Sequence, residues 1–267
     1  MIVACLKWSA RPDAPDDDRF AGVSPADQAA LETALVLGAA RNEDVVAVTV
    51  GPAGAEAALR NALACGAARA VRIELGGLTE PDLADSRDVA AALTHVATGA
   101  SMVLCGDYSL DRGSGSVPAF VAHRLGAAQA LGLVTVGPAN ATGLRVVRRL
   151  DGGRREVLDV ATPCVLSVEG SVATLRRAGL KASLASRQAP IEVRGVTADH
   201  HPHVGSTAAY RPRARVLMPP AGDAALDRLR ALTDAGGGTH RGETVEAPPA
   251  EAAARIVAAL RTWGYLG

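Results

Sequence analysis

The sequence has no excess of charge of either sign, few aromatic residues and no long apolar run. Among its 267 residues, 28 are Lys or Arg, 28 are Asp or Glu, and 3% are aromatic. A nucleic-acid-binding surface is usually strongly basic, so we exclude DNA and RNA as partners. No apolar run approaches the roughly 18 residues that a membrane span needs, and the opening residues MIVACLKW lack the basic region and cleavage site of a secretion signal. We therefore expect a cytoplasmic protein without a membrane span.

Cysteine and histidine are scarce, and their spacing does not indicate a metal centre. Cys5, Cys65, Cys105 and Cys164 lie far apart in apolar surroundings, which favours buried, reduced thiols. The HHPH run at 200–203 contains a proline and lacks the i, i+4 spacing of histidine ligands on a helix. Signatures of hydrolases and metalloproteases, such as G-x-S-x-G and H-E-x-x-H, are absent from the sequence. We therefore expect neither a metal ion nor catalytic residues.

Apolar residues are plentiful, at 48% of the chain, and they fall into short runs that alternate with amphipathic segments. The runs are mostly β-branched or aliphatic, which is typical of parallel strands that are buried on both faces. They lie at residues 2–6, 45–50, 70–75, 101–105 and 133–136. Helices are predicted between them at residues 25–41, 55–65, 86–97 and 117–125. This alternation predicts a doubly wound α/β domain with a mainly parallel sheet in the strand order 3-2-1-4-5.

A β-hairpin and a long C-terminal arm are predicted to follow these elements. Asp151-Gly152-Gly153 supplies a tight turn between two alternating, charged segments, and residues 165–168 have the composition of a further strand. Beyond this strand the periodicity weakens, until an amphipathic helix is predicted at residues 250–263. We divide the chain into an α/β domain with its hairpin, 1–170, and an extended arm, 171–267, whose final helix packs either on a partner subunit or back on its own sheet.

The segment CGDYSLDRGSGSVPAFVAHRLG, residues 105–126, joins the fourth strand to a helix. In the predicted strand order, the first and fourth strands are neighbours and a crevice opens at their carboxyl ends. Gly113 and Gly115 let the backbone approach a ligand closely. Ser114 and Ser116 offer hydroxyl groups, and the N-terminus of the following helix attracts anions. The residues alone leave two interpretations open, a phosphate site or an ordinary turn, because GSGSVP matches neither G-x-G-x-x-G nor G-x-x-x-x-G-K-[ST].

A second polar segment, Ser24-Pro25-Ala26-Asp27, precedes the first helix near the same crevice. As an N-cap, it satisfies the first N–H groups of that helix. We also expect its hydroxyl and carboxylate to lie within reach of a ribose or a base in the crevice. Both interpretations, a plain cap and a ligand contact, therefore stay open.

Three ordered stretches resemble the β subunit of electron transfer flavoprotein. The first is DVVAVTVGPAGAEAALRNALACGAARAVRIE at 44–74, and the second is MVLCGDYSLDRGSGSVPAFVAHRLG at 102–126, which resembles the family's adenine-nucleotide loop. The third is RRLDGGRREVLDVATPCVLSVEG at 148–170, followed by LRRAGLKASLASRQAPIEV at 175–193. It resembles the family's hairpin, its next strand and the segment that recognises dehydrogenases. The resemblance extends from residue 1 to about residue 195.

This resemblance implies an electron-carrier subunit with an adenine nucleotide α-hydrolase-like fold and no catalytic residues of its own. Such a subunit pairs with an α subunit in a heterodimer, binds AMP for structural support, and completes the site of one FAD that the partner mostly holds. Electrons then pass from a flavin-dependent dehydrogenase through the FAD to an acceptor. In these terms, residues 1–170 are the nucleotide-binding domain, and residues 171–267 contain the recognition segment and the arm that packs on the α subunit.

The family's AMP-contacting positions carry over to the two polar segments and to the ends of two strands. They are Cys5, Ser24, Pro25, Ala26, Asp27, Val50, Gly106, Asp111, Gly113, Ser114, Gly115, Ser116 and Val117. By the same resemblance, Leu180 aligns with the leucine that anchors the complex in a dehydrogenase. The resemblance therefore implies one nucleotide site and one docking residue in this chain.

The sequence departs from the family pattern at several of these positions. The family's Asn-Pro-aromatic is Ser24-Pro25-Ala26 here, which leaves Trp8 or Phe20 as the aromatic near the flavin, and Arg112 replaces an acidic residue of the loop. The recognition segment lacks the family's Leu-Pro and its lysine-rich end, which favours a dedicated dehydrogenase, for example of the mycofactocin-linked kind. Two alternatives stay open: a bifurcating-type member with a second FAD in place of AMP, and a stand-alone ATP- or AMP-binding protein of the same fold. An α subunit is excluded, because its Gly-Ile-Ser-Gly signature is absent.

Overall fold

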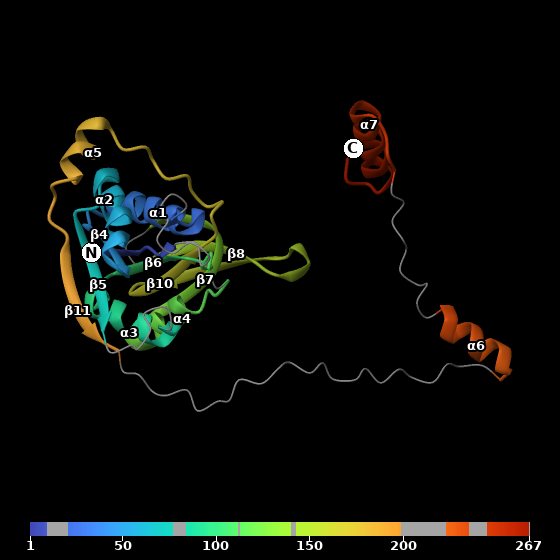
Figure 1. Cartoon of the computed structure of the whole chain (residues 1–267), viewed down its shortest axis with the longest axis horizontal. Helices are drawn as coiled ribbons and strands as arrows, with labels where there is room; N and C mark the ends of the chain where they lie inside the picture. The colour runs from blue at the N-terminus through green and yellow to red at the C-terminus, as the bar shows by residue number, and fades with distance from the viewer. Residues whose placement is uncertain are drawn as a thin grey trace. The chain divides into compact units, whose positions relative to one another are not determined.

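The computed structural model describes residues 1–9, 21–76, 84–111, 113–139, 143–198, 223–234 and 245–266. The chain divides into two compact units, Met1–His203 and Val204–Gly267. Figure 1 shows that the first unit is a central sheet with helices on both faces. The candidate site lies in this first unit.

The first unit is built on a nine-stranded sheet. Its strands are β1 (Ile2–Cys5), β4 (Val45–Val50), β5 (Arg69–Gly76), β6 (Met102–Gly106), β7 (Ala128–Ala139), β8 (Gly143–Arg149), β9 (Arg155–Ala161), β10 (Cys164–Val168) and β11 (Glu192–Thr197). Their order is β11-β5-β4-β1-β6-β10-β7-β8-β9. The strands from β11 to β7 in this order run parallel, and β8 and β9 form an antiparallel hairpin at the edge. The predicted doubly wound α/β class and the added hairpin are confirmed.

One strand departs from the predicted order 3-2-1-4-5. The fifth predicted strand, 133–136, lies within β7, and β10 separates it from the fourth strand, β6. β10 is in parallel register with both neighbours, so that Val165 is opposite Val103 of β6 and Gln129 of β7. All five residues of β10 are buried. The sequence does not reveal this insertion, because strand order depends on pairing between segments that are far apart in the chain.

The helices of the first unit begin and end at recognisable caps. α1 (Pro25–Arg41) and α2 (Glu56–Cys65) cover one face of the sheet, and α3 (Ser86–Ala97) and α4 (Val117–Leu125) cover the other, as Figure 1 shows. A short 3-10 turn, η2 (Ala53–Ala55), leads into α2. The hydroxyl of Ser24 accepts the N–H of Asp27 at the start of α1, while Gly66 and Gly126 end α2 and α4 in the left-handed conformation. The predicted helices are confirmed.

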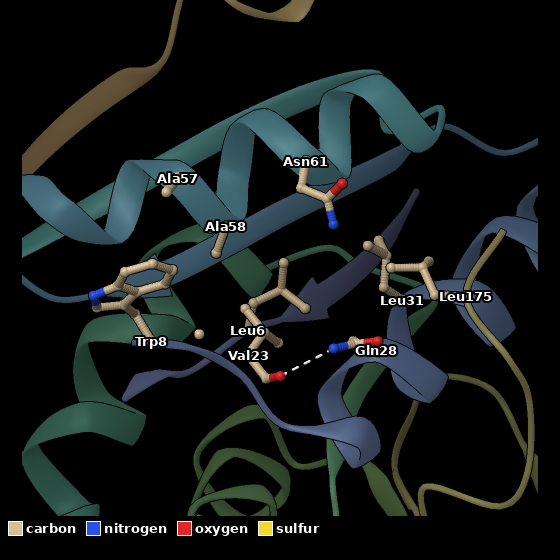
Figure 2. Close-up of a pocket in the computed structure, with 10 residues that line it drawn as sticks. Leu6, Trp8, Val23, Gln28, Leu31, Ala57, Ala58, Asn61 and Leu175 are labelled. Atoms are coloured by element: carbon tan, nitrogen blue, oxygen red, sulfur yellow. Dashed lines mark hydrogen bonds between the residues drawn. The ribbon is translucent and has the colours of Figure 1, made fainter. Parts of the chain in front are cut away.

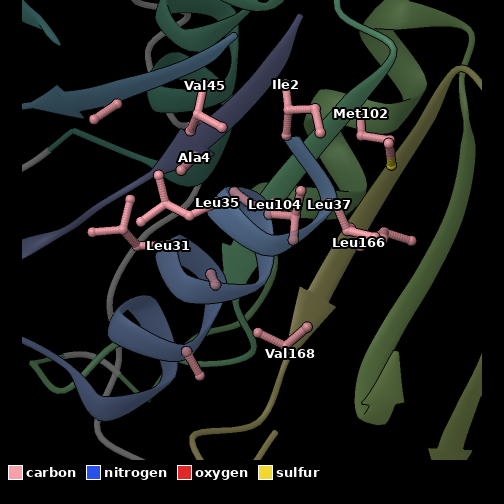
Figure 3. Packing of buried hydrophobic residues seen from close by; sticks show 14 of the residues in the cluster. Ile2, Ala4, Leu31, Leu35, Leu37, Val45, Met102, Leu104, Leu166 and Val168 are labelled. Carbon is pink, nitrogen blue, oxygen red and sulfur yellow. The ribbon is translucent and has the colours of Figure 1, made fainter. Parts of the chain in front are cut away.

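The largest core cluster lies between α1 and the centre of the sheet. Figure 3 shows Leu35 and Leu37 of α1 in one cluster with Ile2, Leu104 and Leu166, which come from β1, β6 and β10. The three strand residues are fully buried. Because successive strand residues point to opposite faces, their neighbours form a second cluster against α3 and α4. The two clusters fix the strands, and therefore the loops at their carboxyl ends.

The sequence analysis does not predict two elements that follow residue 170. They are α5 (Leu180–Ser186) and β11, which pairs in parallel with β5 at the edge of the sheet. Both belong to the first unit, which extends to His203, whereas the sequence analysis places the domain boundary at residue 170. The residues of β11 are exposed or half-buried, and none of them is buried. This strand therefore lacks the continuous apolar run that marks the central strands.

The second unit contains two helices among its described residues. α6 (Ala225–Asp234) is not predicted from the sequence, and α7 (Pro249–Thr262) confirms the predicted final helix. Two large side chains at or beyond the end of α7 are strongly exposed, Trp263 at 69% and Tyr265 at 76%. No helix in the described part of the chain is both long and apolar enough to cross a membrane. The HHPH run at 200–203 lies outside the described residues.

Candidate functional site

The candidate site lies where β1 and β6 end. The two strands are parallel neighbours, with Ile2 opposite Met102 and Ala4 opposite Leu104. The chain continues from β1 toward α1 on one face of the sheet and from β6 toward α4 on the other face (Figure 1). The two connections therefore diverge above adjacent strand ends, which is the geometry of a topological switch point. The crevice that the sequence analysis predicts would lie at this point.

Asp27 ties the start of α1 to the ends of two central strands. Its carboxylate accepts the backbone N–H of Lys7 at 3.1 Å and that of Gly106 at 3.0 Å, and so joins the segment that follows β1 to the end of β6. Burial raises the pKa of Asp27 to about 6, although the hydrogen bonds from Lys7 and Gly106 act to lower it. The sequence analysis expects a ligand contact at Asp27. In the structure both carboxylate oxygens accept hydrogen bonds from the protein's own backbone.

The packing around Gly106 leaves no room for a side chain on this side. A Cβ at Gly106 would lie 2.6 Å from Oδ1 of Asp27 and 3.0 Å from Cβ of Ala26. Ala26 is fully buried there, whereas Pro25, the first residue of α1, is exposed. Ala26 and Asp27 therefore pack the start of α1 against the end of β6, while Ser24 caps α1 itself.

The opposite face of the sheet is covered by α3 and α4. Cys5, Val50 and Val117, all predicted AMP contacts, belong to the apolar cluster on that face. Cys5 is 8% exposed, and Val50 and Val117 are half-buried. These side chains form an apolar surface next to the loop that follows β6.

The loop between β6 and α4 is held by its own backbone. The N–H of Ser109 donates to the carbonyl of Ser114 at 3.0 Å, and the N–H of Gly113 donates to the carbonyl of Ser109 at 2.8 Å. Gly113 has a φ of +61°, which favours glycine, and nothing lies within 4 Å of the position that its Cβ would take. Gly115 is needed for lack of space: a Cβ there would lie 2.0 Å from the carbonyl oxygen of Asp107. The two glycines give the loop its shape and leave open space beside it.

Hydroxyl groups gather at the start of α4. The Oγ atoms of Ser114 and Ser116 are 2.9 Å apart, and the Ser116 hydroxyl donates to Oγ of Ser86 in α3 at 2.8 Å. Ser116 occupies the N-cap position of α4, but its side chain makes no capping hydrogen bond. The N-terminus of α4 thus keeps its uncapped N–H groups and the positive end of the helix dipole beside half-buried hydroxyls. This donor set suits an anion such as a phosphate.

Lys7 links the loop to the end of β1. Its Nζ lies 2.6 Å from Oδ1 of Asp111, and its side chain is 41% exposed. The sequence analysis expects Asp111 to contact the nucleotide. The structure pairs Asp111 with a lysine, so a ligand in the crevice meets an ion pair at this position.

Three residues outside the predicted set also belong to the site: Lys7, Ser86 and Asp107. Oδ1 of Asp107 is buried without a hydrogen-bond partner among the described residues, and burial, followed by the charge of Glu169, raises the pKa of this carboxyl. Lys7 directly follows the predicted strand 2–6, and Asp107 is the second residue after the predicted strand 101–105. Polar residues at strand ends are a signal that the sequence does contain. Ser86 has no such signal, because only the packing of α3 on α4 brings it to Ser116.

The side chain of Trp8 lines a cavity that does not include residues 106–117. Phe20 and Arg112 lie outside the described residues. Figure 2 shows Trp8 beside a cavity of about 200 Å³. The cavity is lined by Leu6, Trp8, Gly22, Val23, Gln28, Leu31, Ala57, Ala58, Asn61 and Leu175. Trp8 and Val23 come from a small antiparallel ribbon of β2 (Trp8–Ser9) and β3 (Gly22–Val23). Because Leu6 and Leu31 belong to the core between the sheet and α1, this cavity is separate from the glycine- and serine-rich loop.

The cysteines lie where the sequence predicts. Cys5, Cys65, Cys105 and Cys164 are all free and buried. Burial raises the pKa of Cys164 to about 11, which makes its thiolate scarce at neutral pH. Within the described residues, no group of three or more His, Cys, Asp or Glu side chains is arranged to hold a metal ion.

The raised pKa of Asp27 predicts that this residue makes the folded protein more stable as the pH falls from 8 to 5. The pKa of this carboxyl is raised from its usual 3.8 to about 6 in the folded chain. The folded state therefore binds the proton more tightly than the unfolded state, and protonation stabilises folding as the pH falls through 6. The expected gain from this carboxyl is about 1.4 kcal/mol in the free energy of unfolding between pH 8 and pH 5. Urea denaturation across this range measures it.

The Asp27→Asn variant is the reference, because it has no carboxyl at this position to titrate. Burial acts to raise the pKa of Glu43, but hydrogen bonds from Arg41, the N-terminal amino group and Ser101 outweigh it and lower this pKa to about 2. The stabilising contribution of Glu43 is therefore lost only below about pH 4.5, outside the measured range. The free energy of unfolding of the wild type, minus that of Asp27→Asn, should increase as the pH falls from 8 to 5. A difference that stays constant from pH 8 to pH 5 would rule out the raised pKa of Asp27.

Comparison with known proteins places the chain in a family. The electron transfer flavoprotein domain profile matches residues 16–199. The chain is similar to Protein FixA of Azorhizobium caulinodans, with 30% identity over 177 residues, which cover 64% of this chain and 63% of the relative. It is also similar to the electron transfer flavoprotein subunit beta of Mycobacterium tuberculosis, with 30% identity over 151 residues, 56% of this chain and 55% of the relative.

A third relative is the acryloyl-CoA reductase electron transfer subunit gamma of Anaerotignum propionicum, with 30% identity over 151 residues, 54% of each chain. The matched part of the chain thus spans between about half and two thirds of the length of these relatives. The family profile, in contrast, covers well over half of this chain and includes α1, the sheet strands other than β1, and the loop before α4. This chain therefore belongs to the electron transfer flavoprotein domain family.

Proposed function

We propose that this chain is the β-type subunit of a heterodimeric electron transfer flavoprotein. It binds AMP as a structural ligand, completes the FAD site of an α subunit, and carries electrons from a flavin-dependent dehydrogenase to an acceptor without catalytic residues of its own. The observation that carries the proposal is the loop of residues 106–117, which presents two glycines and two serine hydroxyls at the start of α4, beside the end of β1. Membership of the family supplies the electron-transfer context.

The residues of the crevice fit the two halves of AMP. The N-terminus of α4 and the hydroxyls of Ser114 and Ser116 supply donors for the phosphate oxygens. Cys5, Val50 and Val117 supply an apolar surface for the adenosine on the face of α3 and α4. An anion at this place neutralises the positive end of the α4 dipole, so AMP stabilises the loop without taking part in the redox step.

The partner α subunit is proposed to hold most of the FAD and to cover the mouth of this loop. When bound, FAD supplies the isoalloxazine ring that accepts and releases electrons. Tyr108 and Leu110 in the loop and Phe120 in the first turn of α4 are 43%, 54% and 39% exposed. Large apolar side chains that are exposed together mark a surface that another protein covers. We assign this surface, and the exposed face of α7, to contacts with the α subunit.

α5 is proposed to be the helix that docks into the dehydrogenase. Leu180 and Leu184 are 77% and 52% exposed. They are four residues apart, so they lie on the same face of the helix. An exposed pair of leucines on a surface helix is suited to an apolar groove on a partner.

Co-expression with an α subunit tests the proposal. The expected product is a heterodimer that carries flavin absorbance through size-exclusion chromatography and that is bleached by a reduced flavin-dependent dehydrogenase. A stable, colourless monomer would count against the heterodimer. Hydrolysis of ATP by the isolated chain would instead favour the stand-alone ATP-binding alternative. AMP is also one half of FAD, so the same loop is suited to a second FAD, and the number of flavins per heterodimer decides between these two ligands.

A further inference from the structure

Apolar burial does little to hold α5 in place. The helix has seven residues, and the buried one is Ser186. Leu180 and Leu184 point away from the protein, as their exposed fractions of 77% and 52% show. A helix of this length is unstable on its own. Its position on the first unit must therefore depend on polar contacts.

Arg60 of α2 makes these polar contacts at the end of α5. Its Nη1 donates to the carbonyl oxygens of Ser186 at 3.0 Å, Arg187 at 2.9 Å and Ala189 at 3.4 Å. The last turn of a helix leaves its carbonyl groups unpaired and carries the negative end of the helix dipole. The two hydrogens of Nη1 serve the two shorter bonds, to Ser186 and Arg187, and the longer contact to Ala189 shares one of them. Arg60 thus caps α5 from a neighbouring helix.

Arg60 is itself held in place by two further side chains. Glu56, one turn earlier in α2, accepts from Nη2 of Arg60 at 3.4 Å and from Nε of Arg72 at 3.1 Å. The Arg72 side chain is 6% exposed, and it also donates to the carbonyl of Gly51 at 3.3 Å. Arg72 therefore fixes Glu56, and Glu56 orients Arg60 toward α5. We call Arg60, Glu56 and Arg72 the α5 clasp.

The segment before α5 is attached elsewhere. Arg176 donates to the carboxylate of Glu32 in α1 from Nε at 2.9 Å, from Nη2 at 2.8 Å and from its backbone N–H at 3.0 Å. The segment before α5 is therefore tied to α1, and the C-terminal end of α5 is tied to α2. Loss of Arg60 should release the C-terminal end of α5 and leave the attachment at Arg176 intact.

We propose that Arg60 is a positioning residue for the dehydrogenase: it holds the end of α5 so that Leu180 and Leu184 stay aligned on one outward face. This inference rests on the proposed function, because it takes α5 to be the docking helix. A preformed helix loses less conformational entropy on binding than a mobile segment does. The clasp therefore increases the affinity for the dehydrogenase and leaves the electron-transfer step unchanged.

The same face also indicates the chemistry of the partner surface. Lys181 lies between the two leucines in sequence, Arg187 follows the last residue of α5, and both are exposed. A groove that accepts two leucines one turn apart, with acidic side chains at its rim, fits this face.

A spin label on α5 tests the clasp in the complete heterodimer. The four native cysteines are buried, so a cysteine introduced by Ala182→Cys, at an exposed position of α5, is labelled selectively. We expect Arg60→Ala to increase the mobile fraction of the electron paramagnetic resonance spectrum roughly threefold, and Arg60→Lys to restore part of the immobile fraction. Arg194→Ala is the matched control, because Arg194 donates to the carbonyl of His95 at 3.2 Å but lies on β11.

Titration with a purified flavin-dependent dehydrogenase that reduces the wild-type heterodimer gives the second readout. We expect Arg60→Ala to raise the dehydrogenase concentration for half-maximal rate roughly tenfold, with an unchanged maximal rate. A spectrum of Arg60→Ala that matches the wild type would overturn the clasp, and a mobile α5 with an unchanged half-maximal concentration would overturn its role in docking. If no such dehydrogenase reduces the wild type, the proposed function fails, and the spectra still decide whether Arg60 holds α5.

Discussion

Replacing Gly115 with alanine is expected to weaken AMP binding by roughly a hundredfold. The new Cβ would lie 2.0 Å from the carbonyl oxygen of Asp107, which no loop conformation like the present one allows. The loop must shift, and the hydrogen bond between Ser109 and Ser114 is then lost. A phosphate that loses two hydrogen bonds to this loop loses about 3 kcal/mol of binding free energy.

Titration calorimetry of AMP into the heterodimer, after its bound AMP has been removed by dialysis in mild denaturant, measures this effect. The matched control is Gly195→Ala on β11, because no atom lies within 4 Å of the Cβ position there and the φ of Gly195 is outside the left-handed range. We expect the control to bind AMP as the wild type does. If Gly115→Ala also binds AMP with wild-type affinity, the phosphate does not lie at this loop.

Replacing Leu180 with aspartate is expected to slow flavin reduction by a limiting concentration of dehydrogenase roughly thirtyfold. Leu180 is 77% exposed, so a charge there leaves the core of the protein intact. In an apolar groove of the partner, the same charge would be desolvated without a counter-ion, and an anchor residue of this kind contributes about 2 kcal/mol or more to binding. The rate is followed as the loss of flavin absorbance.

Val36→Asp is the matched control for this variant. Val36 is also exposed, at 53%, and lies on a helix of the first unit, α1, outside α5. We expect it to retain the wild-type rate, and we expect both variants to retain their AMP and FAD. Equal rates for Leu180→Asp and Val36→Asp would remove α5 from the docking surface.

The central strands and the main helices can be predicted from the sequence because their signals are local. Ser24 caps the start of α1, and Gly66 and Gly126 adopt the left-handed conformation that ends α2 and α4. The apolar runs in β1, β4 and β6 are buried almost throughout. Each of these features depends on residues that are close together in the sequence.

Features that depend on distant segments cannot be predicted in this way. The place of β10 between β6 and β7 follows from pairing with both neighbours, and β11 is a strand because its register fits the edge of β5. Arg60 reaches carbonyl oxygens that lie more than a hundred residues further along the chain. No periodic pattern or short motif marks these contacts.

The candidate site combines both kinds of feature. Its predicted place at the ends of β1 and β6 and the positive φ of Gly113 follow from local patterns and from the rules of α/β topology. The need for glycine at Gly115 does not, because it comes from the carbonyl oxygen of Asp107. The role of Asp27 does not, because its carboxylate accepts N–H groups from two strand ends that only the fold brings together. A residue that the sequence suggests as a ligand contact thus also ties the start of α1 to the ends of β1 and β6.

The nucleotide content of the purified heterodimer tests the central claim most directly. After denaturation, the released small molecules are identified by mass spectrometry and counted against protein. The account predicts AMP and FAD in equal amounts, one of each per heterodimer, and a Gly115→Ala heterodimer that keeps FAD but loses AMP. A wild-type heterodimer that releases FAD and no AMP would contradict the account.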